Sequence, residues 1–138
     1  LDIGVDTENL SRELNFSKLA QHSFAPYEVE LLKQYTTDNI ANQFYTIWTL
    51  KEAYIKARGM GLSIPLDSFW FNYDNESIKI QFSDRCIDNV ENWQFKSVNI
   101  NNSHRVSLAV NATLPIAVTW HEVVPSVQAD LIIKRQVV

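Results

Sequence analysis

Two short segments carry residue types that could do chemistry together. Residues 4–8 (GVDTE) place two carboxylates on a short apolar stretch. Residues 48–56 (WTLKEAYIK) set Glu52 between two ammonium groups, Lys51 and Lys56. Three carboxylates can hold a hard divalent cation through oxygen ligands, and lysines can meet the phosphates that such a cation carries. The pattern indicates chemistry on a phosphate ester or anhydride.

The first segment is predicted to be a strand over residues 1–6, since it is short and contains β-branched residues. Residues i and i+2 share one face of a strand, so Asp6 and Glu8 project together if the strand reaches that far. A solvated strand end is the alternative. Gly4 argues against it, because glycine weakens a strand unless a backbone or a ligand approaches closely. Two adjacent carboxylates also repel unless a cation lies between them.

The second segment is predicted to lie on a helix that Asp38 caps and that stops at Gly59. At about 100° per residue, Glu52 and Lys56 fall side by side outside the apolar stripe. An ordinary surface pair, worth only a few tenths of a kcal/mol, is the alternative for these two. Lys51 falls about 40° from the stripe centre, so it must reach water or a wet cleft, which Trp48 could line.

The remaining pattern predicts an α+β domain, with helices packed on a mostly antiparallel sheet. Two short helices precede the long one, the first capped by Asn15 or Ser17 and the second beginning at Pro26. Strands are predicted in two hairpins and a final segment: residues 69–73 with 77–82, 93–100 with 105–110, and 116–123. Residues 1–123 form the predicted domain. Residues 124–138 are a tail in which 131–133 could form one more short element.

Composition restricts the class of protein. The 138 residues are 46% hydrophobic, enough for one domain with a core. A net charge of −4 speaks against a nucleic-acid partner. No segment is apolar and long enough to span a membrane. With one cysteine, Cys86, no internal disulfide can form, and a reducing, cytoplasmic location is expected.

These residues resemble a known family. The two segments, together with Phe44, residues 59–62 (GMGL) and residues 65–66 (PL), look like the 4′-phosphopantetheinyl transferases. The surfactin-synthetase-activating type is the more similar one. The block around Lys51, Glu52 and Lys56, at this distance from the first segment, carries most of the specificity. The resemblance extends over residues 1–123.

The resemblance implies transfer of the 4′-phosphopantetheine arm of coenzyme A to a serine of an acyl or peptidyl carrier protein, with release of adenosine 3′,5′-bisphosphate. It implies Mg²⁺ bound by Asp6, Glu8 and Glu52. Glu52 is also the implied base for the serine proton. Lys56 is the implied catalytic contact to the phosphate, and Lys51 a neighbouring phosphate contact. Fatty-acid, polyketide and nonribosomal-peptide pathways all use such enzymes.

The chain differs from the surfactin type in length. Those enzymes resemble two similar halves with the active site between them, and this sequence resembles only the C-terminal half. A fragment lacking its N-terminal half and a homo-oligomer both remain open. A non-catalytic domain that binds carrier proteins, or pairs with another chain, is the alternative function. Another Mg²⁺-dependent phosphotransferase is less favoured, because the sequence has no Walker-type phosphate loop.

Overall fold

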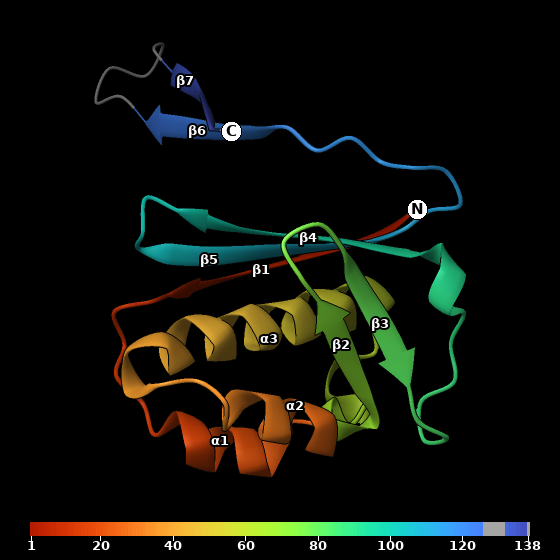
Figure 1. Ribbon diagram of the computed structural model, residues 1–138. Helices are drawn as coiled ribbons and strands as arrows, with labels where there is room; N and C mark the ends of the chain where they lie inside the picture. Colours follow the sequence, from red (N-terminus) through yellow and green to blue (C-terminus); the bar gives the residue numbers. More distant parts are fainter. Residues whose placement is uncertain (126–131, 138) are drawn as a thin grey trace.

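The computed structural model describes residues 1–125 and 132–137. A long helix, α3 (Thr37–Arg58), lies on one face of a three-stranded sheet (Figure 1). The sheet has the order β1 (Asp2–Asn9), β5 (His104–Asn111), β4 (Trp93–Ile100), and both pairings are antiparallel. β1 is therefore an edge strand, although it pairs with a strand about a hundred residues away in sequence. The predicted α+β class is confirmed.

Gly4 allows α3 to lie directly against β1. A Cβ atom added at Gly4 would lie 2.0 Å from the carbonyl oxygen of Ala53 and 2.4 Å from the backbone nitrogen of Ala57. Real Cβ atoms do not approach backbone atoms so closely, so only glycine fits here. The close approach predicted for this glycine is confirmed. Gly4, Asp6 and Glu8 therefore lie on the side of β1 that faces the helix, while the residues between them are exposed.

Two short helices, α1 (Phe16–Ser23) and α2 (Pro26–Leu32), pack on the N-terminal half of α3. Asn15 caps α1 as predicted, since its side chain accepts a hydrogen bond from the backbone of Lys18 at 3.1 Å. Pro26 occupies the first turn of α2. A hairpin of β2 (Phe69–Tyr73) and β3 (Ile78–Phe82) closes the second core cluster around the C-terminal half of α3. Short 3₁₀ turns cover Gly61–Ser63, Leu66–Ser68 and Val90–Asn92.

The turn chemistry of the two hairpins agrees with the sequence. Asn101 and Asn102 both have positive φ between β4 and β5, which asparagine tolerates better than most residues. Asp74 accepts hydrogen bonds from the backbones of Glu76 and Ser77 between β2 and β3. Gly59 ends α3 in the left-handed region, with φ of 65°.

Two expectations about element boundaries were wrong, and the alternative left open for the tail is decided in favour of a further strand. Thr36, not Asp38, is the N-cap of α3, and Asp38 lies in its first turn. The last predicted strand, 116–123, is replaced by β6 (Trp120–Pro125), because the side chain of Gln94 accepts the backbone hydrogen bond of Ile116 instead. The predicted tail contains β7 (Ile132–Val137), which pairs with β6. Leu131, the first residue of the possible short element, lies outside the described residues.

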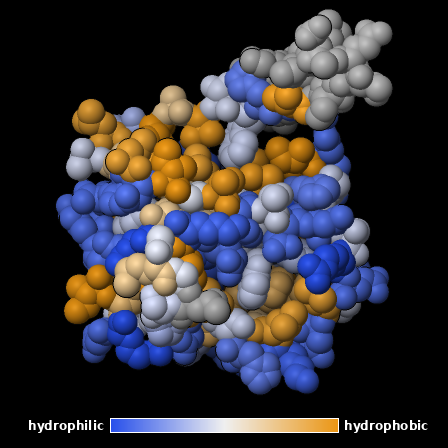
Figure 2. All heavy atoms as spheres, turned by 180° about the vertical axis from the view of Figure 1, so that it is seen from behind, coloured by the Kyte–Doolittle hydropathy of each residue, from blue (hydrophilic) through white to orange (hydrophobic). Residues whose placement is uncertain are grey.

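The face of the sheet opposite α3 is apolar and has no helix on it (Figure 1). Ile3 and Val5 on β1 are 54% and 52% exposed there. On β5, Leu108 pairs with Val5 and is partly exposed, whereas Val110, the partner of Ile3, is buried. From behind, apolar residues form a band across the upper part of the molecule, where the sheet lies (Figure 2). Of the described helices, not one has the length and apolarity needed to cross a bilayer.

Candidate active site

Asp6, Glu52 and Lys56 meet where β1 passes under the C-terminal half of α3. The Nζ atom of Lys56 lies 2.6 Å from Oδ1 of Asp6. The Asp6 side chain is only 9% exposed, whereas that of Lys56 is 51% exposed. Glu52 precedes Lys56 by one helical turn on the same flank of α3 and is partly buried. Two segments that are far apart in sequence therefore form one polar site, as predicted.

The electrostatics of Glu52 reflect the two other acids near it. Burial raises the pKa of Glu52 above its usual value, and the nearby charges of Asp6 and Glu8 raise it further. The Lys56 ammonium lowers it only in part. A carboxylate that is harder to ionise than usual, beside other acids, is a common property of functional sites. The same arrangement suits a proton acceptor or a ligand to a cation.

Asp6 supplies the observation that fits a metal ion. Its Oδ2 atom is buried and has no hydrogen-bond partner. A buried carboxylate oxygen without a partner is costly, and a cation would satisfy it. However, no group of three His, Cys, Asp or Glu side chains in the described part of the chain is arranged to enclose a metal ion. The expected convergence of Asp6, Glu8 and Glu52 on one point is therefore not seen.

The position of Glu8 explains why the three carboxylates do not converge. It lies two residues beyond Asp6 on the same face of β1, as predicted. Its side chain lines a small apolar pocket of about 250 Å³. Trp48 and Tyr45 of α3 form one wall of this pocket, in line with the expected position of Trp48 beside a cleft. The remaining lining residues are Arg12, Leu14, Leu19 and Phe44.

The prediction for Lys51 as a phosphate contact was wrong. Its side chain is completely buried and lies 2.8 Å from Oε2 of Glu28, which is equally buried. The ammonium also donates to the carbonyl oxygens of Leu66 and Phe69, at 2.7 and 2.6 Å. All three of its donors are therefore occupied. Burial raises the pKa of Glu28 and lowers the pKa of Lys51, and their mutual attraction opposes both changes.

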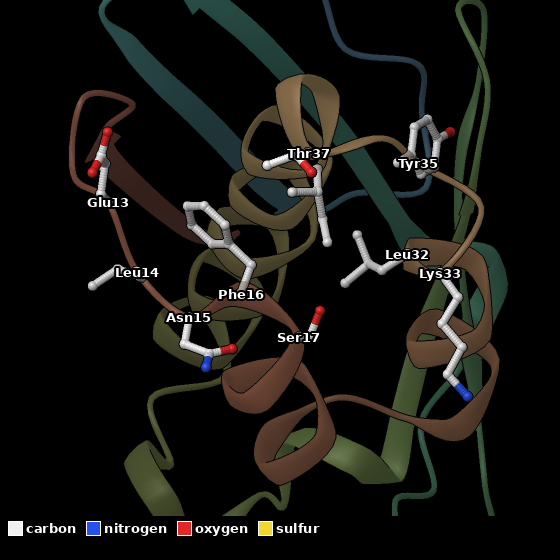
Figure 3. Close-up of a pocket in the computed structure, with 10 residues that line it drawn as sticks. Glu13, Leu14, Asn15, Phe16, Ser17, Leu32, Lys33, Tyr35 and Thr37 are labelled. Carbon is white, nitrogen blue, oxygen red and sulfur yellow. The ribbon is translucent and has the colours of Figure 1, made fainter.

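A large hollow in the described part of the chain lies away from the carboxylates. It has a volume of about 740 Å³ and lies between α1, the end of α2 and the start of α3. Leu14, Phe16 and Leu32 form apolar walls, and Glu13 and Lys33 lie at its rim (Figure 3). None of the predicted site residues lines it. A search for the active site by cavity volume alone would therefore have missed Asp6, Glu8 and Glu52.

Comparison with curated proteins gives relatives of one kind. The chain is 37% identical over 70 residues to the 4′-phosphopantetheinyl transferase gsp of Aneurinibacillus migulanus, covering 51% of this chain and 29% of the relative. It is 37% identical over 67 residues to the 4′-phosphopantetheinyl transferase Sfp of Bacillus subtilis, covering 49% and 29%. The chain thus spans less than a third of the length of these relatives.

Among solved structures, the fold is similar to that of the holo-[acyl-carrier-protein] synthase of Thermotoga maritima. The TM-score is 0.64 at 17% identity, over 88% of this chain and 66% of that one. The family model of the 4′-phosphopantetheinyl transferase superfamily matches residues 2–110, which include β1, α3 and the site between them. The chain belongs to the 4′-phosphopantetheinyl transferase superfamily.

Proposed function

We propose that the protein transfers the 4′-phosphopantetheine arm of coenzyme A to a serine of an acyl or peptidyl carrier protein. The observation that carries the proposal is the junction of Asp6, Glu52 and Lys56, in which a buried carboxylate oxygen has no partner and a half-exposed ammonium lies beside it. In the reaction, the serine Oγ attacks the phosphorus that bears pantetheine. The anhydride bond breaks and adenosine 3′,5′-bisphosphate leaves.

Each residue has a distinct role in this proposal. Lys56 balances the charge that develops on the phosphoryl oxygens, since its ammonium is accessible and already held in place by Asp6. Glu52 accepts the serine proton, directly or through a water molecule, and its pKa, raised above the usual value by burial, makes it a stronger base than an ordinary carboxylate. Asp6 and Glu52 would hold Mg²⁺, with Glu8 as a third acid that must turn out of its pocket. When bound, Mg²⁺ would neutralise phosphate charge.

The apolar pocket beside Glu8 is the place we assign to the acceptor protein. Trp48 lies about 12 Å along α3 from Lys56, which is two turns of helix. A side chain close to the reacting serine could enter this pocket while the phosphate remains at Lys56. The pocket's volume of about 250 Å³ suits one or two apolar side chains rather than a nucleotide.

A second polypeptide surface completes the proposed site. The described residues at the junction supply groups for the phosphates, but the adenosine of coenzyme A also needs a binding surface. We propose that another half or a second copy of this chain provides it. The apolar outer face of the sheet, with Ile3 and Val5 half exposed, supports such a partner.

The test is a mass measurement on a carrier protein incubated with coenzyme A, Mg²⁺ and the complete protein. The parent protein should add one phosphopantetheinyl group, and Asp6→Ala should abolish the addition while the protein remains folded. Asp84→Ala, which removes an exposed carboxylate far from the site in sequence, should transfer normally. If the parent protein bound carrier protein yet transferred nothing, the non-catalytic docking role would replace the enzymatic one.

A further inference from the structure

Arg105 is a partly buried cation that lacks an acidic partner. It lies on β5 with its side chain on the α3 side of the sheet, and its partner in the strand register is Glu8 on β1. Opposite charges at such paired positions would normally attract. Here Glu8 lines the pocket beside Tyr45, whereas Arg105 bonds to Asn42 near the start of α3. Among the described residues, Tyr73 is the only ionisable neighbour that affects the guanidinium of Arg105, so Glu8 forms no ion pair with it.

The guanidinium of Arg105 is poorly satisfied. Its Nη2 atom donates to Oδ1 of Asn42 at 2.5 Å. Its Nε atom is buried and has no hydrogen-bond partner. Burial lowers the pKa of Arg105, and only the hydroxyl of Tyr73 opposes this effect. The charge therefore lies in surroundings without a carboxylate, where a cation is costly to keep.

This situation is unusual within the described part of the chain. The other buried or partly buried cations have acidic partners: Lys51 has Glu28, and Arg58 has Asp88. Between residues 1 and 123, the lysines and arginines without a partner are otherwise exposed and solvated, among them Lys79. The groups around Arg105 are neutral hydrogen-bonding side chains, such as Asn42 and Tyr73, and the latter already donates to Gln43. The site thus offers a positive charge and donors without competing negative charge.

We propose that Arg105 is the centre of an oxyanion-binding site between β5 and the N-terminal half of α3, where its guanidinium contacts Asn42. A phosphate or a carboxylate group would neutralise the guanidinium and accept its free donors. The source of the group is either a phosphate-bearing small molecule or a carboxylate. The inference does not depend on the transferase reaction, since none of the residues assigned to that reaction takes part in it.

Nuclear magnetic resonance of the side chain gives a direct test. The buried Nε–H of Arg105 should give its own signal, identified by its loss in Arg105→Lys. This signal should shift and saturate as sodium phosphate or sodium acetate is added, and sodium chloride at the same ionic strength should not reproduce the shift. Saturation at lower phosphate than acetate would identify a phosphate group as the natural ligand, and the reverse order a carboxylate. An unsaturable shift with both anions would overturn the proposal.

Two variants separate binding from structure. Arg105→Met should weaken phosphate binding, followed at the Asn42 side-chain amide, by about tenfold or more. Lys79→Met removes an exposed charge and should leave this binding unchanged. In buffer without oxyanions, Arg105→Met should be at least as thermally stable as the parent, because it removes a charge without a partner. The proposal would be overturned if Arg105→Met were less stable than the parent and the Nε–H signal of the parent did not respond to anions. Arg105 would then contribute only to the stability of the fold.

Discussion

Lys56 combines an accessible ammonium with a fixed position. The ion pair with Asp6 directs it toward the junction of β1 and α3, while half of its side chain remains exposed to an incoming phosphate. A surface pair of this kind contributes little to stability. In the proposed reaction, the pair would instead place positive charge before a substrate arrives, so that no rearrangement is needed during the reaction.

For Lys56→Ala in the complete protein, we expect kcat to fall by about a hundredfold or more, while the KM for coenzyme A changes less. The reason is that a cation aimed at developing charge acts mainly in the transition state. Steady-state kinetics with a carrier protein would measure this. Lys33→Ala, which removes an exposed lysine from a surface pair, is the control and should leave kcat and KM unchanged. A change confined to KM would make Lys56 a ground-state phosphate clamp.

The raised pKa of Glu52 predicts that the stability of the folded protein depends on pH, and metal binding should reverse this dependence. The pKa of Glu52 in the folded protein is raised above the usual 4.5 by burial and by Asp6 and Glu8. The folded state thus holds this proton more tightly than the unfolded state. The resulting stabilisation is complete below about 4.5 and is lost as pH rises through the folded pKa. Ionised Glu52 then repels its acidic neighbours.

Mg²⁺ at this site should compensate for that repulsion. We expect thermal stabilisation by Mg²⁺ to be small at pH 4.5 and to increase toward pH 7, as Glu52 ionises. Glu52→Gln should lose most of the increase. Calorimetry at several pH values, with equal ionic strength from sodium chloride as the control, would test this. Equal stabilisation in the parent and in Glu52→Gln would remove Glu52 from the metal site.

The packing of α2, α3 and β2 depends on one buried ion pair. Glu28 caps the start of α2 through the backbone of Ala25 and also accepts a hydrogen bond from the backbone of Phe71, at 3.1 Å each. Lys51 neutralises this carboxylate and binds the chain just before β2. The pair therefore joins three elements, and it fixes the face of α3 that buries Lys51. Glu52, the next residue, must then lie toward the site.

Lys51→Met should lower the free energy of unfolding by about 3–5 kcal/mol, because Glu28 would remain buried without its partner. The loss should grow as pH rises above the usual pKa of glutamate, since an unpaired buried Glu28 must bind a proton in the folded state. Chemical denaturation at pH 5 and pH 8 would measure it. Lys33→Met breaks the matched but exposed pair with Glu30 and should cost less than about 1 kcal/mol.

One side of the sheet packs against α3, and on the other side no described helix covers it, although the β6–β7 hairpin lies on that side (Figure 1). On that second side Ile3 and Val5 lie on an edge strand, whose outer backbone groups are also unpaired within the described residues. An apolar face on an edge strand is a favourable surface for another polypeptide. The same strand carries Asp6, so a partner bound there would also border the site.

We expect the isolated chain to self-associate through this face, and Val5→Lys to reduce the association. Sedimentation velocity over a range of concentrations would measure both. Lys has a long polar side chain and Val5 points away from α3, so the fold should be retained. The matched control is Thr7→Lys, two residues further along the same outer face, which replaces a side chain that is already polar. A monomeric chain with full transferase activity would contradict both the partner and the shared site.

The sequence determined those features that depend on local pattern. Turn residues and periodicity predicted both hairpins and the end of α3 at Gly59, since these arise from backbone preferences of neighbouring residues. Spacing along one strand and one helix predicted that Asp6 and Glu8 share a face and that Glu52 adjoins Lys56. Gly4 predicted a close approach because no other residue type permits one.

Only the tertiary structure decided what covers each face. The helical angle of Lys51 was predictable, but its burial required Glu28 from a separate helix. The periodicity of α3 alone gives no information about where that helix packs. The unpaired oxygen of Asp6 and the lack of an ion pair between Glu8 and Arg105 likewise depend on how α3 packs on the β1–β5 pair. Side-chain partners are set by contacts between elements distant in sequence. Local pattern identified the chemical groups, and their pairing followed from the packing of the whole chain.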